Sequence, residues 1–236
     1  MNEHISKAFD TDLQELTRKV AEMGGLAERE IADAIQALTR RDVDLAMRVV
    51  AADPAIDALQ QEIEEKAVLT IARRQPMAVD LREIVAALRV SNDLERIGDL
   101  AKNIGKRVSG LEGEFNPTRL IRGVERMAAL VLAQLKQVLD AYGGRDVAGA
   151  LAVWKGDEQV DALCTSLFRE LLTYMMEDPR NITFCIHLMF CAKNIERMGD
   201  HATNIAETVY YMVEGRPIGD QRPKRDITTF ANAGSP

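Results

Sequence analysis

Cysteine and aromatic residues are scarce in this chain of 236 residues, which contains three cysteines and 5% aromatic residues. An odd number of cysteines without a C-x-x-C pair argues against a disulfide framework or a zinc ribbon, and it fits a reducing cytoplasm. Cys185, His187 and Cys191 do not share one face of a helix. Their spacing therefore favours buried packing over metal binding.

Long apolar runs and an excess of positive charge are also missing. The longest apolar run, residues 184–192, is far shorter than the roughly 20 residues that cross a membrane. The N-terminus is acidic and amphipathic, unlike a signal peptide. Lys and Arg total 30 against 37 Asp and Glu, whereas a general nucleic-acid binder needs a basic surface. We expect a soluble cytoplasmic protein that does not bind nucleic acid.

Catalytic and nucleotide-binding signatures are absent as well. The sequence has no G-x-x-x-x-G-K-[ST], G-x-G-x-x-G, G-x-S-x-G or H-E-x-x-H. Ferritin-like di-iron enzymes are the natural enzyme alternative for a carboxylate-rich helical chain, but they use E-x-x-H motifs, which this chain lacks. A non-enzymatic protein is favoured, with a carboxylate-bridged hydrolase or oxidase as the alternative.

Helix-forming residues are abundant and fall in long periodic stretches. We predict helices at about 6–38, 43–51, 54–74 and 77–108, with Asp42 and Asp53 as N-caps. The pattern then restarts, so that a long helix, a short piece and two more long helices occur twice.

Two segments of the first half reappear in the second half. Residues 41–59 match 145–163 at nine of nineteen positions, and residues 94–106 match 195–207 at seven of thirteen. A repeat of about a hundred residues is large enough to form its own bundle. We therefore predict an all-α fold of two tandem homologous antiparallel three-helix bundles, with six long helices and a pseudo-two-fold repeat. The predicted boundaries are a first bundle at 1–110, a linker at 111–116, a second bundle at 117–213 and a flexible tail at 214–236.

The motif E-R-x-G-D-x-A-x-N-I occurs in both repeats. On a helical wheel its apolar positions form the bundle seam, and its polar positions lie on nearly the opposite face, which we expect to be exposed. The expected outward residues are Glu95, Asp99 and Asn103 in the first copy, and Glu196, Asp200 and Asn204 in the second. Glu207 extends the second stripe, where the first copy has Lys106. Mid-helix Gly98 and Gly199 indicate a close approach by a neighbour.

Two carboxylates one helical turn apart repel each other, so a repeated pair, followed one turn later by the amide oxygen of Asn103 or Asn204, indicates a cation above them. A D-x-x-x-D pair precedes each motif, as Asp53 and Asp57 and as Asp157 and Asp161. An antiparallel hairpin would bring both pairs together into a four-carboxylate patch. Such oxygen ligands suit Mg²⁺, Ca²⁺, Mn²⁺ or iron. The alternatives are a solvated face paired with Arg96 or Arg197 and a purely capping role for Asp53, and we expect His201 to lie partly exposed beside the site.

Residues 80–104, DLREIVAALRVSNDLERIGDLAKNI, and 193–207, KNIERMGDHATNIAE, resemble the paired signatures of the PhoU family, from about residue 6 to 213. The resemblance implies two symmetric three-helix bundles that dimerise, and Fe, Zn, Mn or Mg bound at E(D)-x-x-x-D motifs. These motifs map onto Asp53, Asp57, Glu95 and Asp99, and onto Asp157, Asp161, Glu196 and Asp200.

The same resemblance implies a negative regulator of phosphate-specific ABC transport and of the phosphate-starvation response. Its implied partners are the ATPase subunit of the transporter and a sensor histidine kinase, at the inner face of the membrane. Lys106, in place of an acid, leaves the number of metal ions in the first site open. A metal-free helical scaffold is a third hypothesis.

Overall fold

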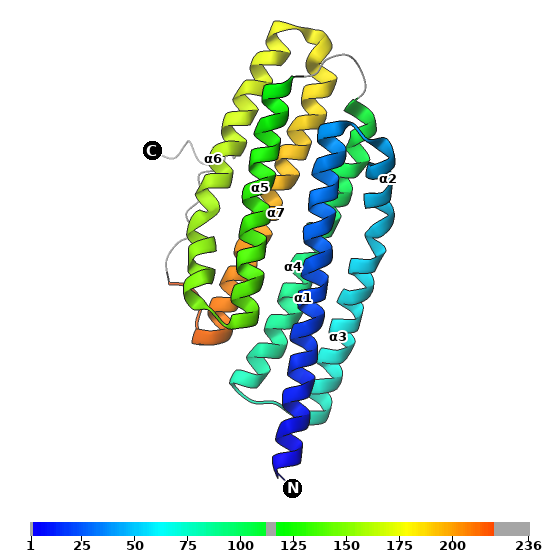
Figure 1. Cartoon of the computed structure of the whole chain (residues 1–236). Coiled ribbons are helices and arrows are strands. Elements are labelled where there is room, and N and C mark those ends of the chain that lie inside the picture. Colours follow the sequence, from blue (N-terminus) through cyan, green and yellow to red (C-terminus); the bar gives the residue numbers. More distant parts are fainter. Residues whose placement is uncertain (1, 112–116, 220–236) are drawn as a thin grey trace, which may run out of the picture.

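The structure is a computed structural model that describes residues 2–111 and 117–219. Within these ranges helices are the only regular secondary structure, and none of them is long and apolar enough to cross a membrane. Figure 1 shows the helices running side by side along the long axis of the molecule. Residues 112–116 of the predicted linker and 220–236 of the predicted tail lie outside the described ranges.

Each repeat folds into a bundle of three long helices. The first contains α1 (Asn2–Arg40), the short α2 (Val43–Ala52), α3 (Pro54–Arg74), α4 (Val79–Val108) and the 3₁₀ turn η1 (Ser109–Leu111). The second contains α5 (Thr118–Gly144), α6 (Val147–Glu177), the 3₁₀ turn η2 (Pro179–Asn181) and α7 (Ile182–Glu214). The predicted all-α fold with six long helices is confirmed.

The two repeats differ at the point where a short helix was predicted in both. Asp42 caps α2 as predicted, because its carboxylate accepts a hydrogen bond from the Leu45 amide at 2.8 Å. Pro54 then separates α2 from α3, since proline has no amide hydrogen to continue a helix. The second repeat has Glu158 at this position, and α6 runs through it unbroken. The second short piece was therefore predicted wrongly.

The two bundles share one hydrophobic core. Helices α4 and α7 pack against each other along their length, and their apolar seams are fully buried. The turn after α1 and the turn after α5 each place an arginine in the left-handed region, with φ of 54° at Arg41 and 52° at Arg145. Arg41 stacks on Phe184 of α7 at 5.2 Å, and Arg145 pairs with Glu83 of α4 at 2.7 Å. The first repeat thus contacts α7 of the second through Arg41, and the second contacts α4 of the first through Arg145.

Candidate functional site

The first group of carboxylates lies where α1, α3 and α4 meet, and we call it cluster 1. It consists of Glu30, Asp53, Asp57, Glu95, Asp99 and the ammonium group of Lys102. The antiparallel hairpin of α3 and α4 brings the two predicted carboxylate pairs together. The electrostatic influence of Asp53, Asp57 and Asp99 on Glu95 reflects this proximity.

Lys102 connects the two helices of this hairpin. Its Nζ atom lies 2.6 Å from Asp53 Oδ2 and 2.6 Å from Asp99 Oδ1. Burial by itself lowers the pKa of Lys102, but the hydrogen bonds to these two carboxylates raise the pKa above its ordinary value. Asp53 stands at the N-cap position of α3 as predicted, but its side chain makes no capping hydrogen bond. The alternative of a purely capping role is therefore wrong, because its carboxylate binds Lys102.

Glu30 was not predicted, and it is the most buried acid of cluster 1 after Asp53. Burial, followed by the negative charge of Asp53, raises the pKa of Glu30 to about 7. Its Oε2 atom is buried without a hydrogen-bond partner among the described residues. A Cβ at Gly98 would lie 3.4 Å from this oxygen and 2.9 Å from Ile56 Cδ1. The prediction that a neighbour approaches Gly98 closely is therefore confirmed.

Glu95 lies at the edge of cluster 1. Burial raises its pKa, and the guanidinium of Arg96, whose Nε is 3.3 Å from Oε2, lowers it in part. Arg96 also approaches Asp99 at 3.6 Å. The alternative pairing of this acidic face with Arg96 is thus present in the structure, beside the stronger bridge made by Lys102.

The second group of carboxylates occupies the equivalent place between α5, α6 and α7, and we call it cluster 2. It consists of Gln134, Asp157, Asp161, Glu196, Asp200 and Thr203. Burial raises the pKa of Glu196, and the nearby charges of Asp200 and Asp161 act in the same direction against Lys193. Lys193 bonds to Glu196 Oε1 at 2.8 Å, while Glu196 Oε2 is buried without a hydrogen bond among the described residues.

Gln134 takes the place of Glu30 in the second repeat. Its side chain is only 5% exposed, and neither its Nε2 nor its Oε1 has a hydrogen-bond partner in the described parts of the chain. Its Nε2 would lie 3.2 Å from a Cβ at Gly156, next to Asp157. A polar residue on the apolar seam of α5 was a signal in the sequence, as was Glu30 on the seam of α1.

The carboxylates are less exposed than the helical wheel predicted. Asp53, Asp157, Asp161 and Glu196 are buried, and Glu95, Asp99 and Asp200 are half-buried. Among the residues predicted to face outward, only Glu196 is buried. Four are half-buried, namely Glu95, Asp99, Asp200 and Asn204, and two are exposed, namely Asn103 and Glu207. The stripe is therefore less exposed than predicted. The side of α4 and α7 opposite the seam is covered by α3 and α6, which a wheel of one helix cannot reveal.

The two asparagines of the motif contribute nothing visible to the clusters. Asn103 is exposed, and Asn204 donates a hydrogen bond to Asp93 of α4 at 3.4 Å. His201 is half-buried and also contacts Asp93, with Nδ1 2.8 Å from Oδ1. Asn204 and His201 of α7 thus join the two repeats through Asp93 of α4. Glu207, predicted to extend the stripe, accepts a hydrogen bond from Trp154 at 3.1 Å.

A metal ion fits the two clusters unequally. No three His, Cys, Asp or Glu side chains of the described residues are arranged to hold a metal as they stand. In cluster 1 the position between Asp53 and Asp99 is filled by Lys102. Cluster 2 offers oxygen donors of the type that hard cations prefer, together with the unpartnered atoms of Glu196 and Gln134. Lys193, however, already pairs with Glu196 at 2.8 Å, and Asp157, Asp161 and Asp200 also have partners.

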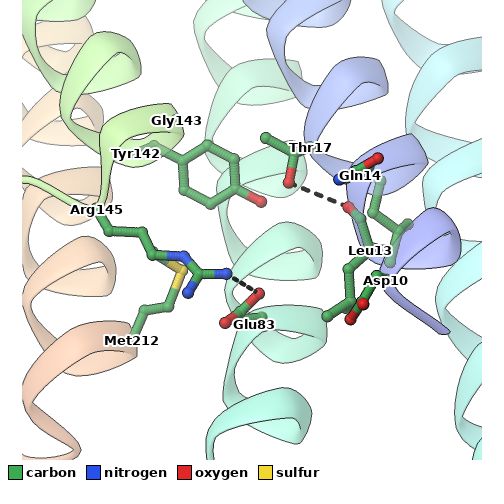
Figure 2. A pocket seen from close by; sticks show the side chains of 10 residues that line it. Asp10, Leu13, Gln14, Thr17, Glu83, Tyr142, Gly143, Arg145 and Met212 are labelled. Atoms are coloured by element: carbon green, nitrogen blue, oxygen red, sulfur yellow. Dashed lines mark hydrogen bonds and ion pairs between the residues drawn. The ribbon is translucent and has the colours of Figure 1, made fainter. Parts of the chain in front are cut away.

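A pocket of about 370 Å³ lies away from both clusters, and none of their residues line it. Figure 2 shows its walls, which come from α1, α4, the turn between α5 and α6, and α7. The Glu83–Arg145 pair crosses its floor at 2.7 Å, and Thr17 donates to the Leu13 carbonyl beside it. Burial raises the pKa of Glu83, and Arg145 opposes this. No motif in the sequence indicated this pocket.

Both repeats match the family model described as the PhoU domain, over residues 20–108 and 124–209. The chain is 56% identical over 226 residues to a "Phosphate-specific transport system accessory protein PhoU homolog" of Rhizobium meliloti, covering 96% of this chain and 95% of that protein. It is 45% identical over 234 residues to a protein of the same name from Zymomonas mobilis, covering 98% and 97%.

Two solved structures share the fold. The crystal structure of PhoU from Pseudomonas aeruginosa matches with a TM-score of 0.84 and 38% identity, covering 88% of this chain and 100% of that one. The phosphate transport system regulatory protein PhoU from Streptococcus pneumoniae matches with a TM-score of 0.83 and 27% identity, covering 89% and 99%. Both carboxylate clusters fall inside the residues matched by the family model.

Proposed function

Because this chain belongs to the PhoU family, we propose that it represses phosphate-specific ABC transport and the phosphate-starvation response when phosphate is plentiful. The relatives are accessory proteins of phosphate transport, so an accessory or regulatory role in this process is the assignment. The protein is accordingly a regulator and not an enzyme. The observation that carries the proposal is identity of about half of all residues along nearly the whole chain.

The proposed partners are the ATPase subunit of the transporter and the sensor histidine kinase of the response. We place the protein in the cytoplasm, at the inner face of the membrane, and as a homodimer. Large apolar side chains support contacts with other proteins, because Met176 is 86% exposed and Met77 is 79% exposed at the two hairpin tips. Light scattering of the purified protein tests the dimer.

Deletion of the gene tests the regulatory role. A phosphate-starvation reporter should be derepressed in high phosphate, and the wild-type gene supplied in trans should restore repression. Unchanged reporter expression in the deletion strain would count against the proposal. A pull-down from phosphate-replete and phosphate-starved cells then identifies which partner binds in which state.

We further propose that metal ions bind to the carboxylate clusters and organise the docking surface. The proposal is supported by the buried Oε2 atoms of Glu30 and Glu196, which lack hydrogen bonds among the described residues. Elemental analysis of protein purified without chelator or affinity-column metal should find Fe, Zn, Mn or Mg. Absence of these metals, with no thermal shift on adding Mn²⁺, Fe²⁺ or Mg²⁺, would favour the metal-free scaffold.

A further inference from the structure

The pocket in Figure 2 lies at one of two equivalent places in the molecule. Each place contains the arginine that follows the first helix of a repeat, Arg145 at the pocket and Arg41 at the other place. Arg145 pairs with Glu83 at 2.7 Å, whereas Arg41 stacks on Phe184 at 5.2 Å. Glu83 and Phe184 are equivalent, because each lies twelve residues before the first glutamate of the repeated motif. The two places can therefore be compared residue by residue.

Polar residues line the pocket where the equivalent place is apolar. Tyr142 corresponds to Leu38 and Thr17 to Ile121, since each pair has the same spacing to its arginine. Leu38 and Ile121 are buried in the core, as is Phe184. Apolar side chains thus satisfy this place in the fold, and a carboxylate in a partly buried position carries a cost that they avoid. The polar groups of the pocket therefore indicate binding of a ligand.

Negative charge exceeds positive charge in the pocket. Its charged side chains are Asp10 of α1, Glu83 of α4 and Arg145 of the turn between α5 and α6. The side chain of Arg145 is 59% exposed, whereas that of Glu83 is 14% exposed. Burial raises the pKa of Glu83, the negative charges of Asp80 and Asp10 act in the same direction, and Arg145 opposes them only in part. A second positive charge in the pocket would stabilise the ionised form of Glu83.

The other walls of the pocket suit a cation that carries a hydrocarbon chain. Leu13 and Met212 provide apolar surface, and Tyr142 adds an aromatic ring, which attracts cations. Figure 2 shows the carboxylates of Asp10 and Glu83 below this ring. The volume of about 370 Å³ lies within the range of sites for small molecules. A bare metal ion would leave the apolar and aromatic surface unused, whereas an organic cation would cover it.

We propose that this pocket binds a small aliphatic amine. The carboxylates of Asp10 and Glu83 hold its ammonium group, and the hydrocarbon chain packs against Leu13 and Met212. Because these side chains come from α1, α4 and α7, the bound amine braces the two repeats against each other. The inference does not depend on the regulation of phosphate transport or on metal binding.

Calorimetry with diaminobutane as the probe tests the inference at neutral pH and low salt. Butanediol is the matched probe, because it has the same carbon chain without the charges. We expect diaminobutane to bind with a stoichiometry of one per chain and to raise the melting temperature of the protein. Butanediol should do neither.

Two variants that remove the same charge show whether the probe binds in the pocket. Glu83→Gln preserves the size of the side chain and should weaken the binding of diaminobutane by about tenfold. Asp80→Asn is the matched control, because Asp80 is exposed on the same helix and does not line the pocket. It should change the affinity by about twofold at most.

A third variant, Arg145→Ala, covers a failure of Glu83→Gln to fold, which circular dichroism detects. It removes the guanidinium that competes for Glu83 and should therefore tighten the binding of diaminobutane. Weaker binding by Arg145→Ala would contradict the inference.

The wild-type protein itself can overturn the inference. If it did not bind diaminobutane, or if it bound diaminobutane and butanediol equally well, the pocket would not be an amine site. Equal losses of affinity in Glu83→Gln and Asp80→Asn would also overturn the inference, because binding would then follow the net charge of the surface and not the pocket.

Discussion

Cluster 1 and cluster 2 carry the same four carboxylates at equivalent positions, yet their neighbours differ. Cluster 1 adds an acid, Glu30, and a base, Lys102, whereas cluster 2 has Gln134 and Thr203 in their places. The counter-charge of cluster 1 is Lys102, which bridges two helices, whereas in cluster 2 Lys193 pairs with Glu196 on its own helix at 2.8 Å. The comparison teaches that a repeated acidic motif does not by itself define a site. The residues that face it from the first helix of the repeat, and from the next turn of its own helix, must also be known.

The largest expected difference between the clusters is in pH dependence, because Glu30 titrates and Gln134 does not. Glu30 ionises near 4.5 when the chain is unfolded and near 7 in the folded protein. Between these pH values the folded state holds a proton that the unfolded state has lost, so the free energy of unfolding falls as pH rises. Glu30→Gln should remove this loss, which is about 3 kcal/mol at most.

Urea denaturation at pH 5 and pH 8, with chelator present, measures this effect. Glu30→Gln should match the wild type at pH 5 and exceed it by about 2–3 kcal/mol at pH 8. Gln134→Glu is the matched variant. It should give the second repeat the same decrease in the free energy of unfolding as pH rises. If the free energy of unfolding changed with pH in the same way in the wild type, Glu30→Gln and Gln134→Glu, the predicted difference between the clusters would be refuted.

The next largest difference concerns the loss of one carboxylate charge from each cluster. Asp53→Asn removes a partner of the half-buried Lys102 ammonium and should lower the free energy of unfolding by about 2 kcal/mol. Glu196→Gln removes a charge that burial already disfavours and should change the free energy of unfolding of the metal-free protein by about 1 kcal/mol or less, upward. Guanidinium denaturation in chelator compares the two.

Addition of Mn²⁺ sharpens this second prediction. Wild-type protein should gain stability on addition of the metal, and Glu196→Gln should gain less. If Asp53→Asn and Glu196→Gln lowered stability equally in chelator, Lys102 would have no special role in cluster 1.

The two mid-helix glycines provide a smaller test with opposite signs. A Cβ at Gly98 would lie 2.9 Å from buried Ile56, so Gly98→Ala should cost about 1 kcal/mol or more through overpacking. A Cβ at Gly199 would lie no closer than 3.5 Å to its neighbours. Gly199→Ala should therefore stabilise the protein by about 0.5–1 kcal/mol through helix propensity. Thermal denaturation of both variants checks the signs, and equal shifts would contradict the expected difference in packing.

The smallest expected difference in the free energy of unfolding concerns the turns after α1 and α5, where Arg41 and Arg145 contact the other repeat. Arg145→Ala leaves the half-buried Glu83 without its partner and should cost about 1 kcal/mol at neutral pH. Arg41→Ala removes a stacking contact with Phe184 and should cost about 0.5 kcal/mol. Chemical denaturation at pH 7 and pH 5 separates them, because protonation of Glu83 should reduce only the first cost. A pH-independent effect of Arg145→Ala would show that its charge is not what matters.

The fold was largely predictable from the sequence because it depends on local signals. Helical periodicity and the Asp42 cap follow from neighbouring residues, the hundred-residue repeat follows from comparing the two halves of the sequence, and all three appear in the structure. The one wrong element, a second short helix, came from extending the break at Pro54 to Glu158, where no proline stands. The domain boundaries drawn through residues 112–116 remain predictions.

The candidate site was only partly predictable because its environment is tertiary. The four carboxylates of each repeat were expected to converge, and the hairpins bring them together. Their burial was missed, since it depends on how α3 and α6 cover α4 and α7. Glu30 and Gln134 were missed because they belong to the first helix of each repeat. Lys102 was not predicted, because only the acidic and amide side chains of the motif were considered as candidate ligands.

The joint at Pro54 gives the two repeats different mechanical properties. In the second repeat α6 is a continuous rod of 31 residues, whose backbone hydrogen bonds resist bending along its whole length. In the first repeat the segment equivalent to α6 is divided into α2 and α3, so bending is concentrated at Asp53 and Pro54. Because Asp53 at this joint lies 2.6 Å from the ammonium of Lys102 on α4, bending between α2 and α3 would disturb that ion pair.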